Sequence, residues 1–359
     1  MRVVIDVTPL FNPLTGIGWY WIGMLDGLAQ ASEGRHEIVA FSVTGPRRRR
    51  PVARALDGLA VERRLVVVPP SASMWRRLWT RAGWPPVERV AGPLDVFHFS
   101  EWMQPTQRGG VRTTTIHDLV PLKFPHWVSP ITRRMHEQRD MLAARECDVI
   151  MCNSRHTAGD VRELLGVPEE RLRVAYPGLD PALHPDGERI ALGAPYVLSV
   201  ATDEPRKNLR AAVQAIRILR SRGSELELAL VGQSGWGDQV GPEPGIRRLG
   251  YRPPSDLPAL YRGAAAFCYP SRFEGFGMPV VEAMACGTPA VCSTDRSLDE
   301  AAGGIALRAD ADDPEAFAEA IEQAVARRDE LLEPGLRHAA QFSRRACGES
   351  VLAAYASAR

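Results

Sequence analysis

The sequence predicts an α/β protein made of two Rossmann-like halves, and three observations favour this fold class. Short runs rich in Val and Ile alternate with segments of helical period, which is the pattern of βα units on a parallel sheet. The series begins again near residue 195, after a stretch rich in Pro and Gly at 176–188 that is typical of a hinge. The chain has 359 residues, more than one hydrophobic core usually serves, so two domains are expected.

The first half contains six predicted strands and three predicted helices. The apolar run at the N-terminus is too short for a signal peptide and contains Asp6, so it is a first strand. The later strands are short runs rich in β-branched residues, and the segments between them show helical period. The strands are predicted at 2–7, 37–43, 64–69, 95–100, 112–119 and 147–154, and the helices at 17–30, 129–145 and 154–165.

The second half repeats this alternation. A strand at 195–202 is followed by a helix at 208–223 whose apolar residues recur at helical spacing. Asp310 and Asp312 are spaced like a metal-binding carboxylate pair. Because a segment of helical period follows them, we predict instead that they lie in the loop before a helix. The remaining strands are predicted at 226–232, 264–271 and 288–293, and a helix is predicted at 279–287, where Gly287 ends it.

Composition excludes several classes of protein. The formal net charge of +1 supplies no field that would attract nucleic acid, and no nucleic-acid motif is present. No run approaches the ~18 uncharged apolar residues of a membrane span. Six scattered cysteines lack CxxC spacing, which argues against both a disulfide framework and a zinc site. We therefore expect a cytoplasmic protein, and leave open a peripheral contact at the inner membrane face.

Several common catalytic motifs are missing. The run GIGWYW at 16–21 has Trp21 where a dinucleotide fingerprint needs its third glycine, and GQSGWG at 232–237 misses the nucleophile elbow by one residue. The chain has no GxxxxGK loop and no HExxH-type histidine spacing. These absences count against a nicotinamide oxidoreductase, a serine hydrolase, a P-loop enzyme and a zinc enzyme.

Lysine and asparagine are rare in this chain, and one residue of each kind lies in the segment EPRKNL. Of the 44 Lys and Arg residues only Lys123 and Lys207 are lysines, and Asn208 is one of three asparagines. Such usage suggests a GC-rich genome that removes both residue types over time. The pair in EPRKNL therefore indicates a chemical constraint, although two survivors can adjoin by chance and Asn208 can equally be a helix N-cap.

The segment SRFEGFGMPVVEAMACGTPAV at 271–291 places Glu282 in an otherwise apolar run. An unpaired buried carboxylate costs several kcal/mol, so Glu282 should bind something. Pro279 suits the first helical position, which leaves nearby amides such as that of Val280 unpaired and able to bind an anion. With Glu274 before the helix, two carboxylates flank this cradle, so the ligand should carry both hydroxyls and phosphate.

This pair, Glu274-x7-Glu282 in the setting EGFGMPVVEAMACGTPAV, resembles the signature of the retaining GT-B glycosyltransferases, the family of bacterial mannosyltransferases, sucrose synthase and glycogen synthase. Four other segments are similar to stretches of the same family, and the matches span nearly the whole chain. They are SVATDEPRKNL, TGIGWY, TIHDLVPLKFP and CNSRHT. The resemblance implies the GT-B fold, with two Rossmann-like domains facing across a cleft. These are an acceptor-binding domain at 1–178, a nucleotide-sugar-binding domain at 179–340, and a C-terminal helix at 341–359 that returns to the first domain.

The resemblance also implies a role for each matching residue. Glu282 would hold the ribose diol, and Glu274 would contact hydroxyls of the donor sugar at the reacting ring. Arg206 and Lys207 would neutralise the diphosphate, and His117 would lie beside the sugar near the acceptor. Backbone groups of two glycine-rich segments would approach phosphate and sugar oxygens of the donor. They belong to Gly16, Gly18, Phe276, Gly277 and Met278.

The implied activity is transfer of a hexose from a nucleoside diphosphate sugar, with GDP-mannose as the first guess. The acceptor would be a hydroxyl of a glycan, a lipid-linked saccharide or a small molecule, and the anomeric configuration would be retained. No cofactor or metal ion is expected, because Arg206 and Lys207 would take the place of the metal. A nucleotide-sugar 2-epimerase of the same fold and a non-catalytic GT-B partner subunit remain as alternatives. The chain departs from the family at Trp19, where relatives often carry Arg, and at ATDEP, where they often have a glycine.

Other features have two interpretations each. The stretch SMWRRLWTRAGWPP at 73–86 interleaves Trp with Arg, which is typical of an acceptor or membrane-surface patch but equally of an amphipathic lid. The arginine run at 47–50 is predicted to be a solvated loop, with binding of lipid phosphate as the alternative. His117 can also be a structural histidine at a strand end. Three further histidines are predicted to be structural: His98, His136 and His156.

Overall fold

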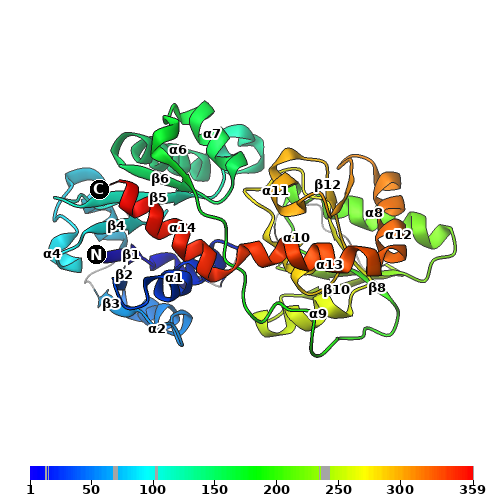
Figure 1. Ribbon diagram of the computed structural model, residues 1–359. Coiled ribbons are helices and arrows are strands. Elements are labelled where there is room, and N and C mark those ends of the chain that lie inside the picture. Colours follow the sequence, from blue (N-terminus) through cyan, green and yellow to red (C-terminus); the bar gives the residue numbers. More distant parts are fainter. Residues whose placement is uncertain are drawn as a thin grey trace. The chain divides into compact units, whose positions relative to one another are not determined.

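The computed structural model describes residues 1–358 apart from 13, 15, 68–71, 102–103, 234 and 236–242. The chain forms two compact units (Figure 1). The first consists of residues 1–178 and 342–359, and the second of residues 179–341. Each unit has its own parallel sheet with helices packed on it, which confirms the predicted α/β class with two Rossmann-like halves.

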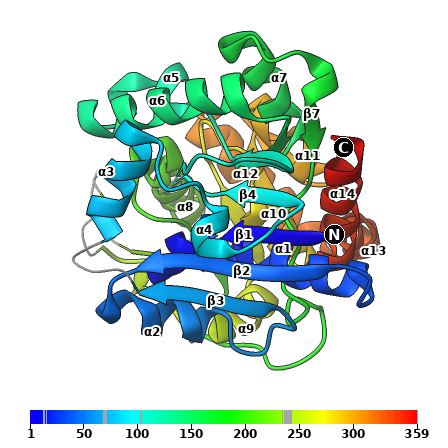
Figure 2. The same cartoon turned by 90° about the vertical axis from the view of Figure 1, so that its left-hand side faces the viewer.

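The first unit is built on a seven-stranded parallel sheet with the order β3-β2-β1-β4-β5-β6-β7 (Figure 2). The central strand β1 pairs with β2 on one side and with β4 on the other. The strands are mostly buried runs rich in Val, Ile and Thr, as expected for a parallel sheet that is covered on both faces. Their bounds are β1 Arg2–Asp6, β2 Glu37–Thr44, β3 Glu62–Val67, β4 Val96–Phe99, β5 Val111–Ile116, β6 Val149–Cys152 and β7 Leu172–Val174.

Successive residues of these strands supply two separate cores, because neighbouring side chains point to opposite faces of a sheet. Val3 and Ile5 pack with α1, α2 and α14, whereas Val4 packs with α3, α4, α6 and α7. The long helices are α1 Gly16–Ser32, α2 Pro46–Ala55, α3 Ala72–Ala82, α6 Pro130–Glu146, α7 Arg155–Leu165 and α14 Arg344–Ser357. The short ones are η1 Thr8–Phe11, α4 Glu88–Ala91, α5 Val120–Lys123, η2 Pro125–Trp127 and η3 Glu169–Arg171.

The last helix of the chain, α14, lies against α1 in the first unit (Figure 1). Two glycines allow this close contact. A Cβ on Gly27 would collide with the carbonyl of Arg344, and a Cβ on Gly348 would collide with the backbone of Gly27. Further along the helix, the hydroxyl of Tyr355 lies 2.8 Å from Nδ1 of the buried His98. His98 is therefore a structural residue, as the sequence predicts.

The second unit has a six-stranded parallel sheet with the order β10-β9-β8-β11-β12-β13. Alternate residues of its strands form a core with α8 and α12. The strands are β8 Tyr196–Val200, β9 Glu227–Val231, β10 Ile246–Gly250, β11 Ala266–Tyr269, β12 Ala290–Ser293 and β13 Leu307–Ala309. The helices are α8 Leu209–Ser221, α9 Leu257–Gly263, α10 Met278–Ala285, α11 Asp299–Ala302, α12 Pro314–Ala326 and α13 Arg328–Ala339. Short 3-10 turns are η4 Pro205–Lys207, η5 Pro254–Asp256, η6 Arg296–Leu298 and η7 Ala340–Phe342, the last of which crosses into the first unit.

Three sequence predictions about individual segments can be compared with the fold. The prediction of a loop at the arginine run 47–50 is wrong, because these residues lie in the first turns of α2, although they are exposed there. The stretch 73–86 contains the amphipathic helix α3, with Trp79 buried and Met74 exposed. The prediction for Asp310 and Asp312 is confirmed, since they lie in the loop before α12.

The described part of the chain has no membrane-spanning helix, no disulfide and no cluster of metal ligands. None of its helices is long and apolar enough to cross a bilayer. All six cysteines are buried and carry free thiols. Nowhere among the described residues do three His, Cys, Asp or Glu side chains gather in a way that could hold a metal ion.

Candidate active site

The strands β8 and β11 form the centre of the second sheet, and the strand order runs outward from them in both directions. Right-handed crossovers therefore place α8 and α10 on opposite faces of the sheet. Open α/β sheets bind ligands at such a point, outside the carboxyl ends of the two strands. Residues 201–207 leave β8 at this edge and residues 270–277 leave β11 beside them. Three of the four charged residues of the predicted donor site, Arg206, Lys207 and Glu274, come from these two loops.

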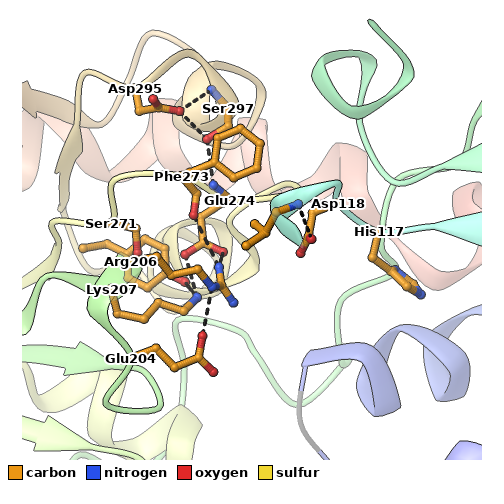
Figure 3. A network of polar contacts seen from close by, with 12 residues as sticks. His117, Asp118, Glu204, Arg206, Lys207, Ser271, Phe273, Glu274, Asp295 and Ser297 are labelled. Carbon is orange, nitrogen blue, oxygen red and sulfur yellow. Dashed lines mark hydrogen bonds and ion pairs between the residues drawn. The ribbon is translucent and has the colours of Figure 1, made fainter. Parts of the chain in front are cut away.

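A compact ionic cluster lies at this edge (Figure 3). The Nζ atom of Lys207 donates to Oε1 of Glu274 at 2.6 Å, and Nη1 of Arg206 donates to Oε2 at 2.8 Å. Lys207 also donates to the hydroxyl of Tyr269 at 2.7 Å, and Nε of Arg206 donates to Glu204 at 2.9 Å. The structure thus brings together Glu274, Arg206 and Lys207, which lie about seventy residues apart in the sequence.

The charges of this cluster control one another. Burial raises the pKa of Glu274, but Arg206 and Lys207 outweigh it and hold the pKa at about 2. Burial and the charge of Arg206 lower the pKa of Lys207, while Glu274 raises it. Glu274 is therefore ionised at neutral pH. Both cations already have a carboxylate partner, and each has more N–H donors than its contact with Glu274 uses.

The backbone around the cluster is fixed by further hydrogen bonds. The amide of Glu274 donates to Oγ of Ser297 at 2.8 Å, and that hydroxyl donates to Asp295 at 2.5 Å (Figure 3). Asn208 has a left-handed backbone, with a φ of 52°, at the N-cap position of α8. Its side chain does not cap the helix but donates to the carbonyl of Ala311 at 2.7 Å. Asn208 therefore joins two loops at the carboxyl edge of the sheet and is a positioning residue.

The start of α10 supplies a second polar element at the same edge. The helix begins at Met278, one position earlier than Pro279 predicts, and the amide of Val280 donates to the carbonyl of Gly277 at 3.0 Å. Val280 is thus not free to bind an anion, which corrects that expectation. Gly277 has a φ of 100°, and a Cβ there would lie 2.5 Å from Cδ2 of Leu298. Only glycine fits this position, which turns the chain from the loop into the helix.

Glu282 lies one turn into α10, and its partner is a tyrosine. The hydroxyl of Tyr261, on α9, donates to Oε2 of Glu282 at 2.7 Å. Burial raises the pKa of Glu282, and the nearby Asp180 raises it further. No arginine or lysine among the described residues pairs with this carboxylate. Tyr261 satisfies one oxygen of Glu282 with a neutral donor, and the other oxygen keeps its capacity to accept hydrogen bonds from a ligand.

The predicted residues of the first unit lie at the carboxyl edge of its own sheet. Gly16 and Gly18 form the first turn of α1, and a Cβ on Gly16 would meet no atom within 4 Å. Thr15, which precedes them in the TGIGWY segment, lies outside the described residues. His117 directly follows β5 and is buried against the ring of Tyr20, 4.7 Å away edge-on. Its burial and the charge of Arg139 lower the pKa of His117 to about 4, so the imidazole is neutral at physiological pH.

Three buried polar atoms at adjacent strand ends of this sheet have no hydrogen-bond partner among the described residues. They are Nε2 of His117, Oδ1 of Asn153 and Oε2 of Glu101. His117 and Asn153 follow the paired residues Ile116 and Cys152 of β5 and β6, and Glu101 lies just after β4. Oδ1 of Asn153 is an acceptor, so a ligand that satisfies it must bring an N–H or O–H donor. Burial raises the pKa of Glu101, and its carboxyl donates a hydrogen bond when it is protonated.

Four of the residues described above were not predicted from the sequence: Tyr261, Tyr269, Glu101 and Asn153. Tyr261 and Tyr269 lie in apolar segments that read as ordinary core, and only the fold brings them to Glu282 and Lys207. Asn153 did carry a signal, because it is one of only three asparagines in the chain.

Comparison with protein families identifies both units. The model described as "Glycosyl transferases group 1" matches residues 183–341, and the model described as "Glycosyltransferase Family 4" matches residues 14–183. O-antigen chain mannosyltransferase B of Escherichia coli is 30% identical over 391 residues and covers 99% of each chain. D-inositol 3-phosphate glycosyltransferase 1 of Catenulispora acidiphila is 29% identical over 311 residues, covering 75% of this chain and 74% of the relative.

Solved structures with the same fold cover nearly the whole chain. Sucrose-phosphate synthase from Thermosynechococcus elongatus superposes with a TM-score of 0.73 at 18% identity, covering 99% of this chain and 98% of the other. Anabaena Alr3699/HepE in complex with UDP-glucose gives a TM-score of 0.72 at 16% identity, covering 99% and 100%. At these identities the likeness shows the fold alone, and the fold is GT-B.

Proposed function

This chain belongs to the group 1 glycosyltransferases of GT-B fold and is an enzyme of that class; from this premise we propose that it transfers a hexose from a nucleoside diphosphate sugar to a hydroxyl acceptor. The observation that carries the proposal is the cluster of Arg206, Lys207 and Glu274 at the carboxyl ends of β8 and β11. This network joins cations that can bind a diphosphate to carboxylates that can accept hydrogen bonds from sugar hydroxyls.

The donor site follows from this cluster. Arg206 offers a planar fork for phosphate oxygens, and Lys207 offers a compact charge. When the diphosphate takes over one of their ion pairs, Glu274 keeps its charge, because its pKa lies far below neutrality. A carboxylate released in this way accepts hydrogen bonds from hydroxyls of the sugar ring. Glu282, held by Tyr261, supplies a second carboxylate for the ribose diol.

Departure of the diphosphate needs positive charge, and we propose that protein side chains supply it. Negative charge develops on the leaving phosphate, where Arg206 and Lys207 stabilise it together with the backbone amides of Gly277 and Met278. The acceptor hydroxyl then attacks the same face of the sugar that the diphosphate leaves and passes its proton to the departing phosphate oxygen, so the anomeric configuration is retained. This chemistry requires neither a metal ion nor a cofactor.

The acceptor side is proposed to use the first unit. The unpartnered oxygen of Asn153 needs a hydroxyl donor, the carboxyl of Glu101 also lacks a partner on Oε2, and the neutral His117 lies between them in strand order. A glycan or a lipid-linked saccharide presents such hydroxyls. The similarity to an O-antigen chain mannosyltransferase favours mannose as the sugar and GDP-mannose as the donor. An acceptor of this kind is also compatible with a peripheral contact at the inner membrane face.

Binding of donors tests the first part of the proposal. A thermal-shift screen with GDP, UDP, dTDP and ADP sugars should single out one nucleotide, with GDP-mannose expected. Calorimetry should then show that Glu282→Ala weakens binding of that donor by ~1.5 to 3 kcal/mol, the loss of one charged hydrogen-bonding group. Equal affinity in wild type and variant would remove Glu282 from the donor site, and no response to any nucleotide sugar would refute the proposal.

Turnover tests the second part. The free nucleoside diphosphate should appear only when an acceptor is present, activity should persist in excess EDTA, and NMR should show the donor's anomeric configuration in the product. Release of nucleoside diphosphate with formation of a 2-epimer in the absence of acceptor would instead establish an epimerase. Loss of turnover in EDTA with recovery on adding Mg²⁺ would refute the metal-free mechanism.

A further inference from the structure

Three side chains at the carboxyl edge of the first sheet, those of Glu101, His117 and Asn153, form what we name the strand-end group. They follow β4, β5 and β6, which are neighbours in the sheet, so they lie side by side along one edge. Each has a buried polar atom without a hydrogen-bond partner among the described residues. The adjacent strand end differs, because Asp6 at the end of β1 accepts hydrogen bonds from two neighbouring hydroxyls. Of these four strand ends, the three of the strand-end group keep the capacity to bind a ligand.

The helix α6 adds one buried cation to this edge. It runs from the carboxyl edge toward the amino edge of the sheet, since β6 begins three residues after it, and its Ala143 lies in the same core as Ile116 of β5. Arg139 lies one turn before Ala143 on the same face, nearer to the strand ends, and is only 9% exposed. Its charge acts on the strand-end group. After burial, Arg139 is the next cause that lowers the pKa of His117, and it opposes the rise that burial causes in the pKa of Glu101.

The protein itself already neutralises this cation. The Nε atom of Arg139 donates to Oδ1 of Asp140 at 2.7 Å, and Nη2 lies 2.6 Å from the same oxygen. Asp140 is fully buried, so water and salt screen the pair little. Burial alone would lower the pKa of this guanidinium, but the charge of Asp140, followed by those of Glu101 and Asp118, raises it. Three carboxyl groups therefore surround one guanidinium, and this edge of the sheet has no excess of positive charge.

Such a site distinguishes hydroxyl groups from phosphate groups. A phosphate beside the strand-end group would lose its hydration and meet a guanidinium whose charge Asp140 already offsets, so no counter-charge would compensate the loss. A hydroxyl carries no charge and can both donate and accept a hydrogen bond. It can donate to Oδ1 of Asn153, and it suits Nε2 of His117 in either tautomer and Glu101 in either protonation state.

We propose that the first unit selects uncharged polyhydroxy acceptors and excludes phosphorylated ones, and that Asp140 sets this specificity by masking the charge of Arg139. This specificity rests on the proposed function, because it requires the first unit to bind the acceptor. Asp140 acts through Arg139 and not by contact with the acceptor. Removal of its charge should therefore open the site to phosphate groups and leave the binding of neutral sugars unchanged.

Binding of a neutral and a phosphorylated probe tests the proposal with the full-length chain. The donor's nucleoside diphosphate is kept saturating, so that the second unit is occupied, and methyl α-mannoside and mannose 6-phosphate are titrated by saturation-transfer NMR. Wild type should bind mannose 6-phosphate about tenfold more weakly than methyl α-mannoside. Asp140→Asn, which keeps an oxygen for Arg139, should bind mannose 6-phosphate about tenfold more tightly than wild type does, the order expected of one unit charge near the ligand.

Two further variants make the result independent of how well Asp140→Asn folds. Asp118→Asn removes a more accessible carboxylate near Arg139 and should raise the affinity for mannose 6-phosphate severalfold. The double variant Arg139→Gln, Asp140→Asn should lose the gain of Asp140→Asn, because the guanidinium that attracts the phosphate is gone. Melting temperatures are recorded for every variant.

The matched control removes one acidic charge from the water-accessible part of the same helix. Glu137 pairs with Arg133 at 2.6 Å on α6, and Glu137→Gln should leave the affinities for both probes unchanged. An equal gain in Glu137→Gln and Asp140→Asn would overturn the proposal, as would a gain in neither Asp140→Asn nor Asp118→Asn. Thermal shifts with nucleotide sugars on the same samples separate the two proposals. If no donor binds, the proposed function fails, whereas donor binding without a gain for phosphate refutes only the acceptor specificity.

Discussion

At the scale of single residues, Lys207 makes the central contacts of the proposed donor site. Its Nζ atom bridges Glu274 and the hydroxyl of Tyr269, at 2.6 and 2.7 Å, in a buried position. Lys207→Ala should lower turnover about 100-fold or more, because a donor aimed at developing charge is lost from a water-poor site. Lys207→Arg should restore only part of it, because the longer planar fork cannot replace one compact donor between two oxygens. Steady-state kinetics with the identified donor measures both effects.

The control for Lys207 is a cation of the same loop region. Arg272 pairs with Asp312 at 2.5 Å, and among the described residues no hydrogen bond or ion pair joins its side chain to Glu274. Arg272→Gln removes a positive charge near the site and should change turnover only severalfold. If Arg272→Gln and Lys207→Ala reduce turnover equally, general electrostatics and not the bridging contact would explain the effect.

A second residue-scale prediction concerns pH and His117. The pKa of His117 is about 4 in the folded protein, because burial and Arg139 lower it, and about 6.5 in the unfolded chain. Between these values the unfolded chain binds a proton that the folded chain does not, so stability falls as the pH decreases through this window. From pH 7 to pH 5 His117 should contribute a loss of about 2 kcal/mol in the free energy of unfolding. Urea unfolding at several pH values measures it.

The comparison for His117 is the variant His117→Gln, which lacks this titration. Its stability should fall less steeply between pH 7 and pH 5 than that of wild type. The pKa of His98 is lowered to about 3, mainly by burial and to a smaller extent by His117, so His98 acts in the same direction in both proteins and most of the difference between the two slopes belongs to His117. Glu274 makes the free energy of unfolding depend on pH only below the pKa that it has in the unfolded chain. That pKa lies below the range from pH 7 to pH 5. Parallel slopes would mean that His117 is not held neutral by the fold.

At the scale of helices and strands, the sequence predicts those elements that carry a clear apolar pattern. The central strands are continuous apolar runs, and α8 buries one face at helical spacing, so their existence and order could be predicted. Three of the four edge strands were missed, because β10 buries only Ile246 of its five residues and β7 and β13 have three residues each. The helix α2 was missed because it contains two prolines and four consecutive arginines and buries only Val52, so its sequence shows no apolar helical period.

The candidate site also contains residues that the sequence predicts and residues that it does not. Glu274 and Glu282 could be predicted, because a carboxylate in an apolar run is conspicuous and the surrounding motif is specific. The two tyrosines of the site could not, since Tyr261 reaches Glu282 and Tyr269 reaches Lys207 only through the packing of α9 and β11 beside α10. The resemblance indicates which residues should contact the donor. It does not reveal the ion pairs that hold these residues in place before the donor binds, because those pairs form only in the folded chain.

The first turn of α10 gives a prediction at the scale of the element. Gly277→Ala places a Cβ 2.5 Å from Leu298 at a φ of 100°, so the loop before the helix must shift. A left-handed backbone costs a non-glycine residue about 1 to 2 kcal/mol, and the collision adds to this. We expect a lower melting temperature together with weaker binding of the donor, because the amides of Gly277 and Met278 move away from it. Calorimetry and thermal unfolding of the same sample measure the two effects.

Gly223→Ala is the matched control for Gly277→Ala. Gly223 also lies in the second unit and has a φ of 92°, but a Cβ there would meet no atom within 4 Å. It should show the backbone cost in the melting temperature and leave donor affinity unchanged. Weakened donor binding in both variants would attribute the effect to general strain in the unit and not to the start of α10.

At the scale of the whole molecule, the last residues of the chain complete the first unit and not the second. The helix α14 covers the sheet face beside α1, with Cys347, Val351 and Tyr355 buried in that core. Deletion of residues 342–359 should therefore expose the apolar face of α1 and destabilise the first unit alone. Hydrogen exchange followed by mass spectrometry should show lost protection in α1 and β4 and retained protection in α8 and β9. Tyr355→Phe, which removes only the hydrogen bond to His98, should cost far less. Equal loss of protection in both units would mean that they fold as one cooperative body, and unchanged protection in α1 would mean that α14 adds nothing to the core of the first unit.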